Sequence, residues 1–506
     1  MNAHGVSQKH ATFSAIFQIF GRKLQEAAEN EDFLSRYHIV VKGNITMPQK
    51  NQNTDGLIDS HQLTSVRARQ IADRRRFLGG AAVAGLTAAA GHSGFAGATE
   101  PASGNGNQDY LNVRTFGARG NGKADDTAAI QKALDAAGKQ GGNVVLLPRG
   151  EYLVRGSLHV PNDVTLQGVF RAPNRGNVGH NKGSLLLATG GKGKPDSTPF
   201  ISLGENGTLY GLAIFYPEQT CPETPVEYPW TVRQLSDNGS LVNVTLLNPW
   251  QGVDFGTVIG GRHYIRGLYG QPLKTGVFID KCEDVGRVED VHFWPFWRAD
   301  AMTMAFTSRH ATAFLIGRTD WQYMFNCFAI CHKIGYHFVR TSSGAPNAVL
   351  TQCGSDEGAP GTQCISVRVD GNQSHAGISF VNGQFMGAPS IEVSATNHGP
   401  VKFTNCGFWG GPLTDTMAVL EGSGQTSFTG CHFTSWAQRN KTAPAIMLRR
   451  GGLIINACEF MDAGSRQVTI ERGAATAVIA ANRFHGSARI SNQIGAKARI
   501  GMNAVE

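Results

Sequence analysis

A short sequence pattern recurs along this chain about every two dozen residues. In each copy, apolar residues placed two apart flank a bend, and the residue at the bend is small or is Asn or Asp. Repetition at such a period predicts a fold of stacked repeats. The bend residues are Asn243, Gly267, Asp290, Asn326, Asn382, Asn405, Gly430, Ala457 and Ala481, with insertions expected after Asp290 and Asn326.

The repeats are expected to be strands, because apolar side chains alternate on both sides of each bend and β-branched, aromatic and glycine residues dominate. One repeat then forms one rung of a right-handed parallel β-helix, an all-β fold. The residues expected to point inward include Leu241, Val244, Leu246, Val288, Val291, Phe293, Phe403, Cys406 and Phe408.

Composition limits the alternatives. The 63 glycines and the long strand repeat indicate one elongated domain in the 506 residues. No run of 18 apolar residues is present, so the sequence predicts no membrane span. The formal charge is +8, but much of the excess lies in the N-terminal region and no basic run follows Arg76. A nucleic-acid partner is therefore disfavoured relative to an acidic polysaccharide.

The nine cysteines do not form the framework of a small disulfide-rich domain. Cys406, Cys431 and Cys458 fall at the same inward position of successive repeats, so we expect them to stack as buried apolar side chains. Cys353 and Cys364 flank a glycine-rich loop. The sequence is compatible both with a disulfide bridge between them and with two free thiols.

The N-terminal region resembles an export leader. Residues 1–73 are interpreted as an extension, either disordered or preceding the true start, for which Met47 is a candidate. Residues 74–98 resemble a twin-arginine signal peptide, with Arg74 and Arg75 ahead of a weakly apolar run and an exit site at Ala98. We therefore expect a periplasmic or extracellular protein that uses the twin-arginine export machinery.

A family resemblance begins at Asn112. Its signature comprises Phe116-Gly117-Ala118, Gly120, Gly122, Asp125-Asp126-Thr127, Ala129-Ile130, Pro148, Gly150 and Tyr152. Over about 60 residues this resembles the opening of the pectate-lyase-like superfamily of right-handed parallel β-helix proteins, which includes rhamnogalacturonases, polygalacturonases and pectate lyases. Asn121 stands where that family usually has Asp, and the later polygalacturonase motifs are absent, so no catalytic residue can be transferred from them.

The resemblance and the residues together predict a capped solenoid. Residues 99–143 are expected to form an N-terminal cap with a helix, residues 144–490 the β-helix, and residues 491–506 a C-terminal tail. Asp125 or Asp126 is expected to accept hydrogen bonds from the first N–H groups of the capping helix. This role is favoured over a catalytic pair of carboxylates.

Polar side chains are concentrated in the repeats between Trp250 and Trp321. Strand alternation places Tyr264, Arg266 and Tyr269 outside in one rung, and it places Arg287, Glu289 and His292 at matching positions in the next. Adjacent rungs lie about 4.8 Å apart, so these six side chains are expected to share one patch.

We interpret this patch as a site that cleaves a glycan. The candidate catalytic residues are Glu289, Asp254, Asp280, His292, Arg287 and Arg266. The candidate substrate-binding residues are His263, Tyr264, Tyr269, Trp250, Trp294, Trp297 and Trp321. Tyr216, Tyr228 and Trp230 in a proline-rich insertion are also candidates to stack on sugar rings, with packing on the wall of the β-helix as the alternative.

Three functions remain open at this level. The first is an exported glycoside hydrolase with two carboxylates, acting on a uronate-containing or other acidic polysaccharide. The second is a polysaccharide lyase with an Arg or Lys base. The third is a non-catalytic β-helix that binds glycan. No cofactor is expected, since no loop spacing supports a Ca²⁺ site, and the sequence leaves monomer and trimer open.

Overall fold

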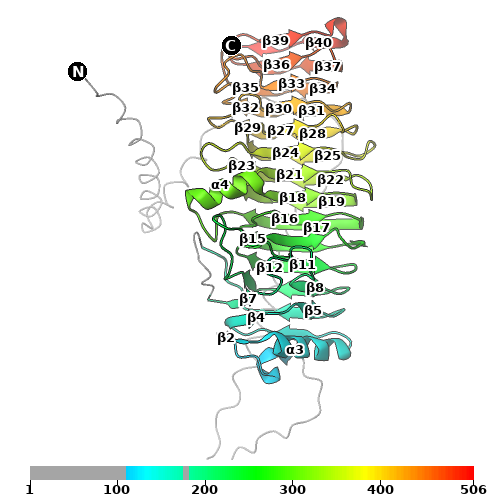
Figure 1. Cartoon of the computed structure of the whole chain (residues 1–506). Helices are drawn as coiled ribbons and strands as arrows, with labels where there is room; N and C mark the ends of the chain where they lie inside the picture. Colours follow the sequence, from blue (N-terminus) through cyan, green and yellow to red (C-terminus); the bar gives the residue numbers. More distant parts are fainter. Residues whose placement is uncertain (1–109, 175–181) are drawn as a thin grey trace, which may run out of the picture. The chain divides into compact units, whose positions relative to one another are not determined.

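The computed structural model describes residues 110–174 and 182–506. These residues form a stack of rungs along one axis, each rung consisting of strands joined by bends and loops (Figure 1). All the strand pairings between successive rungs are parallel, and the rungs follow one another in sequence. Crossovers between parallel strands are right-handed in almost all proteins. The predicted right-handed parallel β-helix is confirmed.

The strands make three faces, which we call face 1, face 2 and face 3. Face 3 contains β5 (Leu158–Val160), β8 (Ile201–Leu203), β11 (Trp230–Gln234), β13 (Gln251–Phe255), β16 (Thr275–Ile279), β18 (Thr312–Ile316), β21 (Ile334–Phe338), β24 (Ile365–Val369), β27 (Ile391–Val393), β30 (Ala418–Leu420), β33 (Ile446–Leu448), β36 (Val468–Ile470) and β39 (Ile490–Asn492).

Face 1 lies before the bend of each rung. It contains β1 (Leu111–Asn112), β3 (Val144–Leu146), β6 (Thr165–Gln167), β9 (Thr208–Tyr210), β14 (Gly260–Gly261), β19 (Thr319–Phe325), β22 (Ala348–Thr351), β25 (Ile378–Val381), β28 (Val401–Thr404), β31 (Gln425–Thr429), β34 (Gly451–Asn456), β37 (Ala474–Ala480) and β40 (Ala498–Gly501). Three longer strands run through the bend from face 1 into face 2: β12 (Ser240–Leu246), β15 (Tyr264–Gly270) and β17 (Cys282–Phe293).

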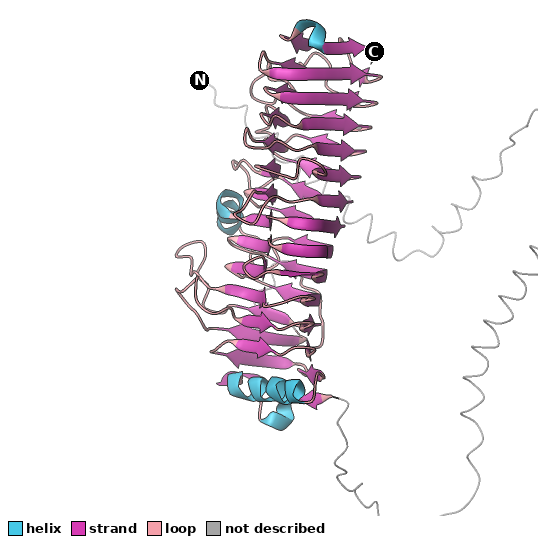
Figure 2. Ribbon diagram, turned by 90° about the vertical axis from the view of Figure 1, so that its right-hand side faces the viewer, coloured by secondary structure: helices cyan, strands magenta, loops and turns pink. Residues whose placement is uncertain are grey.

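Face 2 follows the bend. It contains β2 (Asn121–Asp125), β4 (Gly150–Val154), β7 (Ser184–Ala188), β10 (Ala213–Phe215), β20 (Phe328–Ile330), β23 (Gly354–Asp356), β26 (Gln384–Met386), β29 (Gly407–Trp409), β32 (His432–Thr434), β35 (Glu459–Phe460), β38 (Arg483–Phe484) and β41 (Ala504–Val505). Figure 2 shows the rows of strands lying along the stack.

The bends depend on the left-handed backbone conformation. All nine residues predicted from the repeat have a positive φ, from 51° at Asn326 to 69° at Gly267. Asn, Asp and Gly adopt this region at least cost, which explains why they recur at the bend. The pattern missed Gln352, which has a φ of 54° and supplies the bend of a further rung between Asn326 and Asn382. The long interval after Asn326 is therefore two rungs rather than one rung with an insertion.

The core fills the interior between the three faces. The nine residues predicted to point inward are all buried. Phenylalanines stack from rung to rung on faces 1 and 2, as Phe403 does on Phe428 with ring centroids 5.3 Å apart. Cys406, Cys431 and Cys458 are buried beside them, as predicted. Cys353 and Cys364 are both free, so the bridge considered between them is not formed.

One helix closes the N-terminal end of this core. Helix α3 (Thr127–Lys139) buries Ile130, Ala133, Leu134 and Ala137 against the first rungs. Asp125 accepts a hydrogen bond of 3.0 Å from the backbone N–H of Thr127, while Asp126 accepts two bonds from the loop at Arg119 and Gly120. The helix thus ends the stack of apolar side chains, which would otherwise face water.

The other helices in the described residues are short. They are α4 (Ala301–His310), η3 (Val113–Phe116) and η4 (Gly495–Lys497). Helix α4 lies on the side of the stack and accounts for the predicted insertion after Asp290 (Figure 1). The β-helix also continues past the predicted boundary at Ile490, because β40 and β41 pair with β37 and β38. Across residues 110–174 and 182–506, no helix is long and apolar enough to cross a membrane.

Candidate active site

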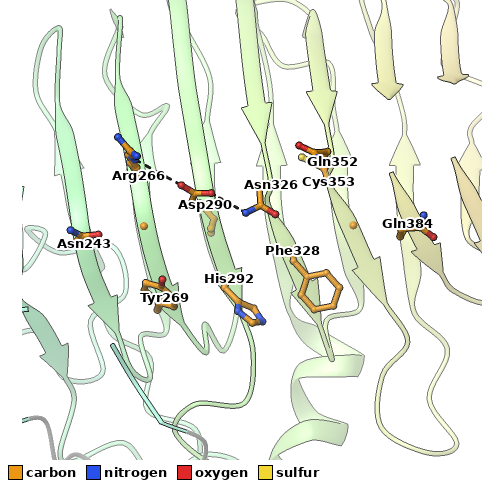
Figure 3. A pocket seen from close by; sticks show the side chains of 13 residues that line it. Asn243, Arg266, Tyr269, Asp290, His292, Asn326, Phe328, Gln352, Cys353 and Gln384 are labelled. Carbon is orange, nitrogen blue, oxygen red and sulfur yellow. Dashed lines mark hydrogen bonds and ion pairs between the residues drawn. The ribbon is translucent and has the colours of Figure 1, made fainter. Parts of the chain in front are cut away.

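A groove with a volume of about 660 Å³ follows the bend between faces 1 and 2 (Figure 3). It crosses several rungs, so each rung contributes a few outward side chains from its bend and from the start of face 2. The residues that line it are Asn243, Arg266, Gly267, Tyr269, Asp290, Val291, His292, Asn326, Phe328, Gln352, Cys353, Gly354 and Gln384.

The bend residues form the polar floor of this groove. Asn326 donates a hydrogen bond of 2.9 Å from Nδ2 to Oδ1 of Asp290 on the preceding rung. At Gly267 a Cβ atom would lie only 2.5 Å from Oδ1 of Asn243, so any other residue at this bend would displace the Asn243 side chain. The residue type that allows the left-handed backbone therefore also places amide and carboxylate groups side by side along the groove.

Arg266 supplies the positive charge of the groove. Its Nε lies 3.8 Å from Oδ2 of Asp290, and both side chains are largely open to solvent. An exposed ion pair at this distance contributes little to stability. Arg266 is therefore free to turn toward an anionic group of a ligand at small cost.

Tyr269 and His292 occupy equivalent positions on adjacent rungs, because β15 pairs with β17 in a register that sets one opposite the other. The His292 ring packs edge-on against Phe296 and Phe328, with centroids 5.4 Å and 5.5 Å away. This burial lowers the pKa of His292 below its usual value, because the charged imidazolium is disfavoured in an apolar setting. A neutral imidazole beside a phenol can take up or deliver protons at neutral pH.

The predicted register of this region is correct. Tyr264 lies opposite Arg287, Arg266 opposite Glu289, and Tyr269 opposite His292. The six side chains do not share one site, however. Arg266, Tyr269 and His292 line the groove, whereas Arg287 and Glu289 lie along a separate hollow of about 310 Å³ on the outside of face 1.

Glu289 is placed away from the other predicted carboxylates. Its Oε2 accepts a hydrogen bond of 3.1 Å from the Tyr264 hydroxyl. Asp254 is on β13 and Asp280 follows β16, so both belong to face 3. The expected pairing of Glu289 with Asp254 or Asp280 is therefore not formed.

Asp254 and Asp280 instead accept hydrogen bonds that hold neighbouring strands and turns. Asp254 is fully buried, accepts a bond from Arg233 Nε at 2.5 Å, and accepts two more from the backbone of Gly256 and Thr257. Asp280 accepts bonds from the backbone of Arg318 and from the Thr341 hydroxyl. Strand alternation identified these as polar positions, but it does not distinguish a catalytic acid from one that fixes a turn.

Three of the seven predicted substrate-binding residues, His263, Trp250 and Trp297, are buried. His263 is fully enclosed, and burial lowers its pKa to about 4. Trp250 and Trp297 lie within the core cluster, as do Tyr216 and Tyr228. Trp294 packs against Phe296, with centroids 5.5 Å apart. Trp321 is well exposed on face 1, outside the groove. The buried rings therefore pack on the wall of the β-helix and are not available to stack on sugar rings.

Sequence reasoning missed several groove residues. Asp290 and Asn326 were identified only as bend residues, and Phe328, Gln352 and Gln384 were not singled out. Their positions directly at or after the bend were a usable signal, because the groove follows the bends. Among residues 110–174 and 182–506, no group of three or more His, Cys, Asp or Glu side chains is arranged to hold a metal ion.

Residues 110–179 match the family model described as rhamnogalacturonase A/epimerase, pectate lyase-like. The resemblance to the pectate-lyase-like superfamily is confirmed. The match covers the N-terminal cap and the first rungs, the same part of the chain that carries the sequence signature. It does not include the groove residues from Asn243 onward.

Three curated relatives match short segments of this chain. Alginate lyase 7 of Azotobacter vinelandii is 64% identical over 45 residues, which are 9% of this chain and 5% of that protein. The mannuronan C5-epimerase AlgE4 of the same organism is 59% identical over 107 residues, which are 21% of this chain and 18% of that protein. A probable glucan endo-1,3-β-glucosidase of Arthroderma benhamiae is 39% identical over 59 residues, 12% of this chain and 6% of that protein. The matches thus span a small part of each relative.

Solved structures that are similar to this one include the A-module of the mannuronan C5-epimerase AlgE4 from Azotobacter vinelandii. It is 16% identical, covers 79% of this chain and 97% of that module, and has a TM-score of 0.45. The N-terminal fragment of gene product 12 of bacteriophage phi29 is 14% identical, covers 77% and 72% of the two chains, and has a TM-score of 0.49.

Proposed function

We propose that this protein is a carbohydrate-active enzyme that cleaves a uronate-containing polysaccharide by β-elimination. The observation that carries the proposal is the placement of Tyr269 beside His292, with Arg266 in the same groove. A base, an acid and a cation are the groups that proton removal next to a carboxylate requires.

His292 is assigned the role of base. Its lowered pKa keeps the imidazole neutral near neutral pH, so it can accept the proton from C5, the carbon that carries the uronate carboxylate. As the C5–H bond breaks, a double bond forms between C4 and C5 and the C4–O bond to the neighbouring sugar breaks. The Tyr269 hydroxyl gives its proton to the departing oxygen, and the proton on His292 later restores it.

Arg266 is assigned to the uronate carboxylate. Removal of the C5 proton places negative charge on that carboxylate, and an adjacent guanidinium stabilises the charge in the transition state. The Gln352 and Gln384 side chains line the same groove and can donate hydrogen bonds to sugar hydroxyls. Asp290 positions the guanidinium group through its ion pair with Arg266. Asn326 in turn positions Asp290 by donating a hydrogen bond to its carboxylate.

Hydrolysis by two carboxylates is less well supported. A glycosidase needs two carboxyl groups facing the same bond, about 5.5 Å apart for retention or 6.5 to 9.5 Å for inversion. Asp290 is the single carboxylate among the described residues that line the groove. The predicted partners Asp254 and Asp280 lie on face 3.

The named relatives support the choice of substrate class. An alginate lyase and a mannuronan C5-epimerase both act, by their names, on uronate polymers or their C5 carbon. Lyase and epimerase chemistry share the removal of the C5 proton and differ in whether the C4–O bond then breaks. We also propose that the protein works in the periplasm or outside the cell after twin-arginine export, on the basis of the Arg74-Arg75 motif.

The experiment that tests the proposal is incubation of the purified protein with polymannuronate, polyguluronate, polygalacturonate and a neutral glucan. We expect ultraviolet absorbance from unsaturated uronate ends with an acidic polymer and none with the glucan. His292→Gln and Arg266→Ala should each reduce the rate by about 10²-fold or more, while the matched exposed variant His159→Gln should not. New reducing ends without unsaturated uronate would overturn the lyase assignment, and C5 inversion without chain cleavage would replace it with an epimerase.

A further inference from the structure

Strand β19 exposes three aromatic side chains in a row on the outside of face 1. Trp321, Tyr323 and Phe325 alternate with the buried residues Gln322 and Met324, and they are 49%, 44% and 45% exposed. Within the described part of the chain, no other strand exposes more than one aromatic ring to this extent. We call these three residues the aromatic strip.

Positive side chains flank the aromatic strip on both sides. Arg287 lies opposite Tyr323 on the adjacent rung, is exposed, and forms no ion pair with any described residue. Arg340 is likewise exposed and unpaired among the described residues. It borders a hollow of about 680 Å³ together with Trp321 and His375. The positive charges of Arg287 and Arg340 are therefore available to bind a ligand.

Asp284 and Asp320, which line the hollow beside Trp321, are each paired with an arginine, Asp284 with Arg262 at 3.4 Å. Asp320 is paired with Arg318 at 2.8 Å. Glu289, which lies opposite Phe325, accepts the hydroxyl of Tyr264. The neutral phenol leaves the charge of Glu289 in place, and Glu289 forms no ion pair with a described residue. Two unpaired arginines, Arg287 and Arg340, therefore stand against one unpaired carboxylate on this part of face 1, and the surplus is positive. A single exposed ring would need no explanation, but three rings in one strand beside two unpaired arginines form a surface suited to a ligand.

We propose that the aromatic strip, with Arg287 and Arg340, is a second binding surface for an acidic polysaccharide, separate from the groove. The rings provide flat apolar faces for sugar rings, and the guanidinium groups bind the uronate carboxylates in a bidentate manner. The choice of an acidic glycan rests on the proposed function and on the sign of the unpaired charge. Strand β19 ends next to Asn326, which lines the groove, so one long polymer can occupy both surfaces.

Such a surface would hold the polymer near the groove between reaction events. A second point of attachment raises the local concentration of substrate without any new contact at the reacting bond. The two contributions to binding should also differ in their response to salt. Contacts of the exposed arginines with carboxylates weaken as ionic strength rises, whereas stacking on the rings does not depend on charge.

The test measures binding of the full-length protein to immobilised polymannuronate and polygalacturonate, with His292→Gln as the background so that no turnover occurs. Trp321→Ala with Tyr323→Ala should weaken binding at least about tenfold, and Arg287→Ala with Arg340→Ala should both weaken it and reduce its salt dependence. Val478→Ala, also exposed on face 1, and Arg472→Ala, an exposed arginine without an ion pair among the described residues, are the matched controls and should leave binding unchanged.

Binding of either double variant at the strength of the background protein would overturn the proposal. So would a change from dimer to monomer in the aromatic variant without loss of glycan binding, because the strip would then be a contact between two copies. The result is independent of the proposed reaction. If the protein with intact His292 cleaves no uronate polymer but the strip variants lose binding, the β-elimination fails and the second surface stands.

Discussion

Tyr269 lies directly opposite His292 in the parallel pairing of β15 with β17, and both side chains line the same groove. The hydroxyl and the imidazole come from positions 23 residues apart, one rung of the β-helix. The register of the backbone therefore fixes their relative position, and Phe296 and Phe328 hold the imidazole from two sides.

The first prediction concerns pH. If neutral His292 is the base, the rate should fall as the pH drops through its lowered pKa, giving an acid limb below the usual value of about 6.5. Phe328→Ala removes one of the two rings that bury the imidazole, so the pKa should rise and the acid limb should move to higher pH. Profiles of kcat/KM against pH for the two proteins measure this shift. An acid limb that stays in place would show that another group controls it.

The second prediction separates a structural from a catalytic carboxylate. Asp254→Asn removes the buried charge that pairs with Arg233 at 2.5 Å. Breaking a buried ion pair from one side should cost about 3 kcal/mol in the free energy of unfolding. The rate per folded molecule should change little, because Asp254 lies on face 3. Denaturant unfolding and turnover of the same preparation measure both effects. A folded variant without activity would restore Asp254 as a catalytic residue.

The third prediction concerns stability at acid pH. His263 and His332 are fully buried, and burial lowers the pKa of each to about 4. Between pH 6.5 and pH 4 the unfolded chain binds these protons and the folded chain does not. The free energy of unfolding should therefore fall as the pH drops through this window, by at most about 3 kcal/mol for each histidine.

A substitution isolates one of these two groups. His332→Phe keeps an aromatic ring beside Phe293 and removes the titrating group. The stability of this variant should fall less steeply between pH 6.5 and pH 4, while its difference from the natural protein should be constant above pH 7. Urea unfolding at a series of pH values measures the slope. An unchanged slope would mean that His332 is protonated in the folded state.

The fourth prediction concerns export, for residues that lie outside the described part of the chain. Replacing Arg74 and Arg75 with Lys should retain the protein in the cytoplasm, because the twin-arginine machinery recognises the pair. Fractionation of cells that express the two forms measures the effect. A matched pair of substitutions, Arg67→Lys with Arg69→Lys, should leave export intact. Normal export of the Arg74 and Arg75 variant would contradict the interpretation of the leader.

The sequence by itself determined the solenoid, because its requirements are local. A positive φ is cheapest for Asn, Asp and Gly, and alternate apolar residues on each side of a bend can only point into a core. The bend at Asn326, the inward position of Cys431 and the pairing of Tyr269 with His292 follow from these rules. Gln352 was missed because glutamine is neither small nor Asn or Asp, the residue types that mark the other bends.

Only the tertiary structure decided which outward residues act together. The loops that join the three faces have no fixed length, so the sequence period does not reveal whether Glu289 and Asp254 meet. The structure places them on faces 1 and 3, and it leaves Asp290 as the carboxylate of the groove. It also separates Trp321, on open surface, from Trp250 and Trp297, in the core. Composition treats these rings alike, whereas burial depends on what the loops fold against.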